Sequence, residues 1–70
     1  MPYKVNKVRA KRLKEFRLDK GLSQLEMGEL VGVNQPTISL WERCHLNISD
    51  AMAVRIAKAF KMSVKKFWGE

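Results

Sequence analysis

Uncharged hydrogen-bonding side chains gather in the middle of this 70-residue chain, where amides and hydroxyls recur at close spacing. A glutamine or asparagine amide both donates and accepts hydrogen bonds, and so does a hydroxyl. Residues 21–42 hold three acidic residues and no Lys or Arg. The segment therefore offers directional hydrogen bonding rather than attraction by positive charge. The residues concerned are Ser23, Gln24, Asn34, Gln35, Thr37 and Ser39.

Residue types that support catalysis or metal binding are sparse. The chain has one Cys and one His, and it contains no Ser/His/Asp or Cys/His arrangement, phosphate loop or metal-ligand spacing. We therefore expect a protein that is not an enzyme and needs no cofactor or metal. A single Cys excludes a disulfide within the chain and fits a reducing cytosol. No apolar run approaches the roughly 20 residues of a membrane span, so we expect a cytoplasmic location.

Positive charge lies on either side of the central segment. Residues 1–20 carry eight Lys or Arg and two acids, and residues 43–70 carry six and two. The net charge of +7 therefore comes from the two ends of the chain. Basic ends favour a polyanionic partner such as DNA, RNA or an anionic membrane surface over a role in solubility alone. We expect a flexible basic arm over residues 1–6 and a single domain over residues 7–70.

Five short helices are predicted to position these residues, and no strand signal is found. Capping residues predict their starts, with Asn6 before a helix to about residue 19 or 20, Ser23 before 24–31 and Asn34 before about 35–43. Ser49 or Asn47 precedes a helix over about 50–60, and Ser63 precedes one over 64–68. Turns of two to five residues force steep packing angles. The predicted fold is all-α, a compact bundle of five short helices.

The second and third helices meet the steric requirements of a helix-turn-helix. Gly28 is small where the two helices come close, and Gly32 can adopt the left-handed conformation of the turn. Val33 anchors the turn, and Ile38 and Trp41 lie three apart on the inner face of the third helix. Chance can supply any two of these features, whereas all of them together with two caps form a specific signal.

These features resemble the lambda-repressor-like, Cro/cI-type (XRE family) helix-turn-helix DNA-binding proteins. The resemblance covers about residues 13–67 and is more specific for the fold than for the DNA sequence that is read. It implies a small phage or bacterial transcriptional regulator that binds double-stranded DNA as a homodimer at a pseudo-palindromic operator. The residues that carry it are Arg17, residues 21–24, Gly32, Val33, residues 37–39, Trp41, Glu42, Ile56, Ala57 and Ser63.

The resemblance also implies roles for individual residues. The third helix becomes the recognition helix in the major groove, with base contacts from Gln35, Pro36, Thr37, Ser39 and Leu40. The resemblance places phosphate contacts at Gln24, Arg43, His45 and Asn47. Helix N-termini attract phosphates, which adds Ser23 and Asn34. The positive charge of the first helix adds Lys7 and Arg12, with a solvated helix face as the alternative. Arg17 and Glu42 match a buried ion pair between the first and third helices, and the alternative is two unrelated surface charges.

The chemistry of the third helix favours A·T base pairs. Glutamine pairs with adenine through two hydrogen bonds, and leucine or proline packs on the thymine methyl. No Arg lies among the base-contacting positions, so the commonest contact to guanine is missing. Leu40 has an alternative interpretation as an incidental exposed leucine. Helix N-termini and the flanking basic residues must then hold the phosphates.

Two positions depart from the family pattern at helix ends. Cys44 and Lys61 stand where relatives carry glycine after a helix. Cys44 must therefore accept a strained left-handed backbone, unless the loop takes another course. A redox role for this cysteine is a further alternative to its being a plain small residue.

Apolar residues outside the expected core leave other functions open. Leu25 and Leu30 occupy helix positions that are usually polar, and they are either simply exposed or a surface for a protein partner. Of Phe67 and Trp68 we expect one to complete the core and the other to serve a dimer contact. The rival functions are a protein-interaction module and an antitoxin-type component with the same fold.

Overall fold

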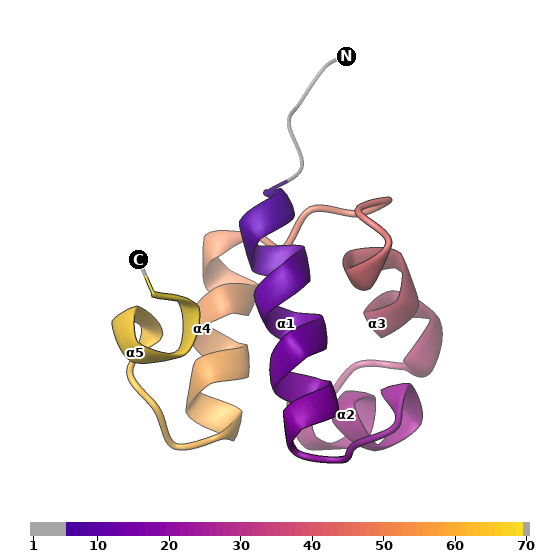
Figure 1. Ribbon diagram of the computed structural model, residues 1–70, viewed down its shortest axis with the longest axis horizontal. Coiled ribbons are helices and arrows are strands. Elements are labelled where there is room, and N and C mark those ends of the chain that lie inside the picture. Colours follow the sequence, from indigo (N-terminus) through magenta and orange to yellow (C-terminus); the bar gives the residue numbers. More distant parts are fainter. Residues whose placement is uncertain (1–5, 70) are drawn as a thin grey trace.

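The computed structural model describes residues 6–69, and these residues fold into five α-helices without a strand. Figure 1 shows α1 in the centre, with α2 and α3 on one side and α4 and α5 on the other. The predicted all-α bundle is confirmed, whereas the predicted arm falls, apart from Asn6, on residues 1–5, outside the described residues. The helices are α1 (Lys7–Asp19), α2 (Gln24–Val31), α3 (Gln35–Glu42), α4 (Asp50–Ala59) and α5 (Val64–Trp68).

Each of these helices begins at a side chain that accepts a hydrogen bond from a backbone amide three residues later. Such short acceptors satisfy an amide that the helix cannot pair internally. Of the two candidates before α4, Ser49 is the cap. Asn47 instead accepts a hydrogen bond from the backbone N–H of Asn6 at 2.8 Å, which ties the start of α1 to the loop before α4. The five caps are Asn6, Ser23, Asn34, Ser49 and Ser63.

The predicted capping box at the start of α2 is present. Ser23 accepts from the Glu26 backbone N–H at 3.0 Å, and the Glu26 carboxylate accepts from the Ser23 backbone N–H at 2.9 Å. The backbone N–H of Ser23 lowers the pKa of Glu26, and the Ser23 hydroxyl adds to this effect. Because the folded state lowers this pKa, the contribution of the box to stability is complete above the ordinary glutamate pKa and is lost as the pH falls.

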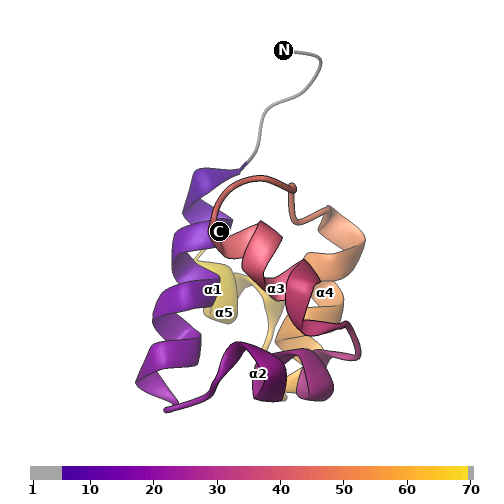
Figure 2. The same cartoon turned by 90° about the vertical axis from the view of Figure 1, so that its right-hand side faces the viewer.

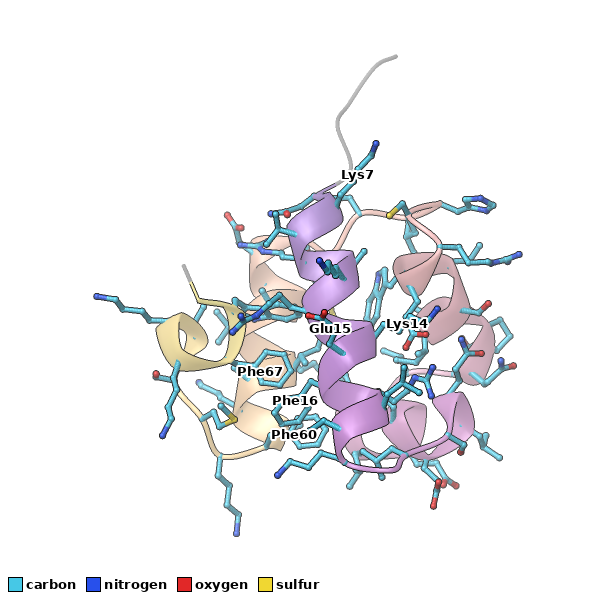
Figure 3. All side chains as sticks on the ribbon, viewed as in Figure 1. Lys7, Lys14, Glu15, Phe16, Phe60 and Phe67 are labelled. Carbon is cyan, nitrogen blue, oxygen red and sulfur yellow. The ribbon has the colours of Figure 1, made fainter. Side chains whose placement is uncertain are left out.

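Both aromatic residues of α5 lie in a core to which all five helices contribute. Trp68 is 1% exposed, and its indole N–H donates to the carbonyl oxygen of Ala53 at 2.9 Å. Phe67 is 2% exposed and packs against Phe16 and Phe60 from α1 and the end of α4 (Figure 3). The expectation that one of the two would be left for a dimer contact is therefore wrong. The other buried apolar residues are Ala10, Leu13, Met27, Val31, Ile38, Trp41, Ile48, Ala53, Ile56 and Ala57.

Two glycines allow the close turn between α2 and α3. Gly32 ends α2 in the left-handed conformation, with φ of 88°. A Cβ atom on Gly28 would lie 2.6 Å from the carbonyl oxygen of Val33, so any side chain there would push the turn away. The neighbour that Gly28 admits is thus the backbone leading into α3, rather than the body of α3 itself.

Cys44 and Lys61 adopt the left-handed conformation although they carry side chains, with φ of 61° and 56°. After α3, the backbone N–H of Cys44 donates to the Trp41 carbonyl oxygen, and that of His45 donates to the Leu40 carbonyl oxygen. The alternative of a different loop course is thus excluded at Cys44. A non-glycine residue in this region costs about 1–2 kcal/mol.

Replacing Cys44 with glycine is expected to raise the free energy of unfolding by about 0.5–1 kcal/mol, because relief of the backbone strain exceeds the extra freedom of the unfolded glycine. For a domain of this size the melting temperature should rise by about 2–8 °C. Cys44→Ala is the matched control, since it removes the thiol but keeps the Cβ atom, and it should give no gain. Equal melting temperatures for the two variants would contradict the prediction.

Candidate nucleic-acid interface

The outer face of α3 presents the side chains that the sequence predicts to contact bases. Ile38 and Trp41 are 0% and 3% exposed and fix the inner face of α3 against the core. Figure 2 views the molecule from the α3 side, with α5 behind. Pro36 is exposed on the opposite, outer face. The other four predicted residues, Gln35, Thr37, Ser39 and Leu40, are partly exposed.

Four side chains form a hydrogen-bonded series from α1 to the start of α3. Arg17 Nε donates to Glu42 Oε2 at 2.7 Å, and Arg17 Nη2 donates to Glu42 Oε1 at 3.0 Å. The Gln24 amide donates to the same Oε1 at 3.2 Å. Gln24 Oε1 in turn accepts from Gln35 Nε2 at 2.6 Å. The series therefore connects an ion pair to the first residue of α3.

The ion pair at the start of this series is nearly enclosed. The side chains of Arg17 and Glu42 are 11% and 3% exposed, which rules out two unrelated surface charges. Arg17 Nη1 also donates to the carbonyl oxygen of Leu22 at 2.8 Å. The hydrogen bond to Glu42 raises the pKa of Arg17, while burial opposes this rise. Both charges are therefore satisfied by partners within the fold.

The carboxylate of Glu42 fixes the direction of the series. An ionised carboxylate only accepts hydrogen bonds, so Gln24 must turn its NH2 group toward Glu42 and its carbonyl toward Gln35. Gln35 must then use one of its two N–H donors on Gln24. One N–H donor and one carbonyl acceptor remain on Gln35. This is the pair of groups that complements N7 and the N6 amino group of adenine in the major groove.

Ser23 and Asn34, the capping residues of α2 and α3, still have hydrogen-bond donors that the caps do not use. Asn34 Oδ1 accepts from the backbone N–H of Thr37 at 3.1 Å and from its hydroxyl at 2.5 Å. The Asn34 NH2 group and the Ser23 hydroxyl proton remain for other acceptors, and both residues are exposed. The positive end of each helix dipole favours an anion there. The Thr37 hydroxyl has used its proton and can only accept.

Several arginines hold the fold together, which the sequence reasoning missed. Each donates to a carbonyl oxygen in a loop or near the end of a helix, where the helix itself supplies no partner. Arg12, which was predicted to contact a phosphate, donates instead to a carbonyl oxygen near the end of α5. Every residue has a carbonyl oxygen, so no sequence signal marks such an acceptor. The bonds run from Arg9 to Ile48 at 2.9 Å, Arg12 to Phe67 at 2.9 Å and Arg55 to Val31 at 3.0 Å.

The remaining predicted phosphate contacts lie around α3 and at the start of α1. Arg43 and His45 are exposed directly after α3. Asn47 is partly buried and accepts from the Asn6 backbone through its carbonyl, so its NH2 group is left as a donor. Lys7 is exposed at the N-terminal end of α1 (Figure 3).

The two unusual leucines of α2 do not form one continuous surface by themselves. Leu25 and Leu30 are 59% and 53% exposed. Five residues correspond to a rotation of about 140° around a helix beyond one full turn, so the side chains project in different directions. The two side chains therefore lie on different parts of the α2 surface.

Residues 6–69 show no metal site and no membrane span. They gather no group of three His, Cys, Asp or Glu side chains that could hold a metal ion. No helix among them has the length and apolar character needed to cross a membrane. An open hollow of about 290 Å³ lies between α1 and α5, away from α3, and it is lined by Arg12, Glu15, Phe16, Asp19 and Phe67.

Comparison with known proteins identifies the family of this chain. A model of the helix-turn-helix family matches residues 13–67, which include the whole series from Arg17 to Glu42. The uncharacterized HTH-type transcriptional regulator YgzD of Bacillus subtilis (strain 168) is 38% identical over 60 residues, covering 84% of this chain and 91% of the relative.

Solved structures are similar over most of the chain. The crystal structure of the hypothetical transcription factor NHTF from Neisseria matches with a TM-score of 0.77 and 27% identity, covering 89% of this chain and 71% of that one. The P22 c2 repressor protein, in complex with a synthetic operator, matches with a TM-score of 0.69 and 26% identity, covering 83% and 88%. The chain therefore belongs to the helix-turn-helix family and has the lambda-repressor-like fold of its XRE type.

Proposed function

We propose that this DNA-binding transcriptional regulator reads the major groove with the outer face of α3, with Gln35 as the residue that recognises adenine. The observation that carries the proposal is the hydrogen-bonded series that leaves Gln35 one donor and one acceptor at the start of α3. Since the orientation of Gln35 is set before binding, less side-chain entropy is lost on contact with the base. The further base contacts would come from Pro36, Thr37, Ser39 and Leu40.

Phosphate binding is proposed to surround the uncharged face of α3. Free N–H groups at the starts of α2 and α3 supply one part of it, together with the exposed donors of Ser23 and Asn34. Gln24 keeps one amide proton for a phosphate after its bond to Glu42. Positive charge comes from Arg43 and Lys7, and His45 and Asn47 complete the set.

We propose that two copies of the protein bind one pseudo-palindromic operator, and that they do so in the cytoplasm. One recognition helix reaches only a few base pairs, so a single domain of this size has limited discrimination. Two copies bound one helical turn apart would double the number of base pairs read. Because Phe67 and Trp68 are buried, a contact between copies would have to form elsewhere than on these two side chains.

Selection of bound sequences from a random DNA pool tests the proposal. We expect enrichment of related half-sites whose central positions are A·T pairs, because residues 35–42 hold Gln35 for adenine and no Arg for guanine. Enrichment of G·C pairs opposite α3 would contradict the assignment of Gln35. No enrichment over bulk DNA at moderate salt would contradict sequence-specific binding altogether.

A further inference from the structure

The end of the molecule that carries α5 is strongly basic and has no role in the interface described above. Residues 51–69 include five Lys or Arg and no Asp or Glu. Arg55 bonds the end of α2, whereas the other four are exposed lysines. Within residues 6–69, none of these lysines forms an ion pair or a side-chain hydrogen bond. The α5-end lysines are Lys58, Lys61, Lys65 and Lys66.

Lys65 and Lys66 lie on α5, at the other end of the molecule from α3. Figure 1 places α3 and α5 at opposite ends of the longest axis, and Figure 2 again places α5 behind α3. The molecule extends 33 Å along that axis. The Debye length at physiological ionic strength is only about 8 Å, so phosphates at α3 are largely screened from these lysines.

Local stability does not account for all of this charge. Lys58 lies in the last turn of α4, and Lys65 and Lys66 lie in α5, where a helix C-terminus favours positive charge. Lys61 belongs to neither helix and holds a left-handed backbone that suits glycine better. At this position a lysine adds charge to the surface where glycine would relieve strain.

We propose that the α5-end lysines bind the phosphate backbone of a second DNA duplex, so that a protein molecule held by α3 bridges two DNA segments. Duplex DNA presents about one negative charge per 1.7 Å of its length, and lysines bind phosphates without reading bases. Phe67 and Trp68 are 2% and 1% exposed, so neither ring is available to enter a membrane or to stack on single-stranded bases.

Acidic residues beside α5 disfavour a partner whose negatively charged surface would cover both α5 and α1. Glu15 and Asp19 on α1 line the hollow that Phe67 also lines. A broad anionic surface that covered both helices would meet these carboxylates. The phosphates of a duplex backbone can contact α5, the turn before it and the last turn of α4 without covering the acidic residues of α1.

A capture experiment with the full chain tests this proposal. A duplex carrying the selected site is immobilised and saturated with protein, and capture of a fluorescent 30-base-pair duplex that lacks the site is measured. The test variant combines Lys61→Gln, Lys65→Gln and Lys66→Gln. The charge-matched control combines Lys7→Gln, Lys11→Gln and Lys14→Gln on α1. Circular dichroism melts establish that both variants fold.

The wild-type protein should capture the second duplex, and the α5 variant should reduce capture at least about tenfold while changing affinity for the site less than twofold. The log–log salt slope of capture should fall by about 3, near 0.9 for each phosphate that the variant no longer neutralises. The α1 control should lower the affinity of the protein for the selected site. It should have a smaller effect on the amount of second duplex captured per bound protein molecule. The proposal is overturned if wild-type protein binds the site without capture, if the α5 variant captures normally, or if polyglutamate competes as well as DNA at equal charge. Failure to bind the selected site would instead overturn the proposed function.

Discussion

Arg17→Ala is expected to lower the free energy of unfolding by about 3–5 kcal/mol, because it leaves the carboxylate of Glu42 buried without its cationic partner. A 70-residue domain has a total stability of roughly 4–10 kcal/mol, so the variant should be close to unfolding at 25 °C. Thermal and urea unfolding followed by circular dichroism would measure the change. The expected fall in melting temperature exceeds about 12 °C.

Two further variants separate the buried pair from ion pairs in general. Asp50→Asn breaks the bond between Arg9 and Asp50, whose side chain is 94% exposed, and it should cost less than about 1 kcal/mol. The double variant with Arg17→Met and Glu42→Leu removes both buried charges and should recover much of the stability that Arg17→Ala removes. A fall of only a degree or two in Arg17→Ala would contradict the buried pair.

Gln35→Ala is expected to weaken binding to the selected site by about 1–3 kcal/mol per half-site, which is roughly 5- to 150-fold. The loss arises because the amide pairs with adenine through the donor and acceptor that the bond to Gln24 leaves open. Fluorescence anisotropy would measure the affinity for the selected site and for a site in which that A·T pair is replaced by G·C. For Gln35→Ala the two affinities should become nearly equal.

The Gln24→Ala variant distinguishes two roles of Gln24, which are to orient the Gln35 amide and to hold a phosphate. If Gln24 only held a phosphate, its removal would weaken both sites by the same factor. We expect instead that the ratio between the A·T and G·C sites falls, because Gln35 loses the carbonyl that directs its amide. An unchanged ratio would contradict this orienting role.

Much of the local structure could be predicted from the sequence because it depends on neighbours within a few residues. Asn34 caps α3 through the amide of Thr37, only three positions away, and Gly32 ends α2 through its own backbone freedom. The inward positions Ile38 and Trp41 follow from helical periodicity alone. The caps of four helices, and the helix-turn-helix that α2 and α3 form, therefore follow from short stretches of the chain, whereas the choice between Ser49 and Asn47 before α4 came from the structure.

Local patterns in the chain establish the helices, the turn and the residue types on the face of α3. The orientation of those residues, and the charges that are left for a partner, depend on packing between distant segments. Arg12 closes α5 across 55 residues, and Gln35 is oriented by Gln24 and Glu42 from two other positions in the chain. The same folding places α5, which carries Lys65 and Lys66, at the end of the molecule opposite α3. Such partners are set by packing between distant segments, and a carbonyl acceptor common to every residue leaves no pattern to read.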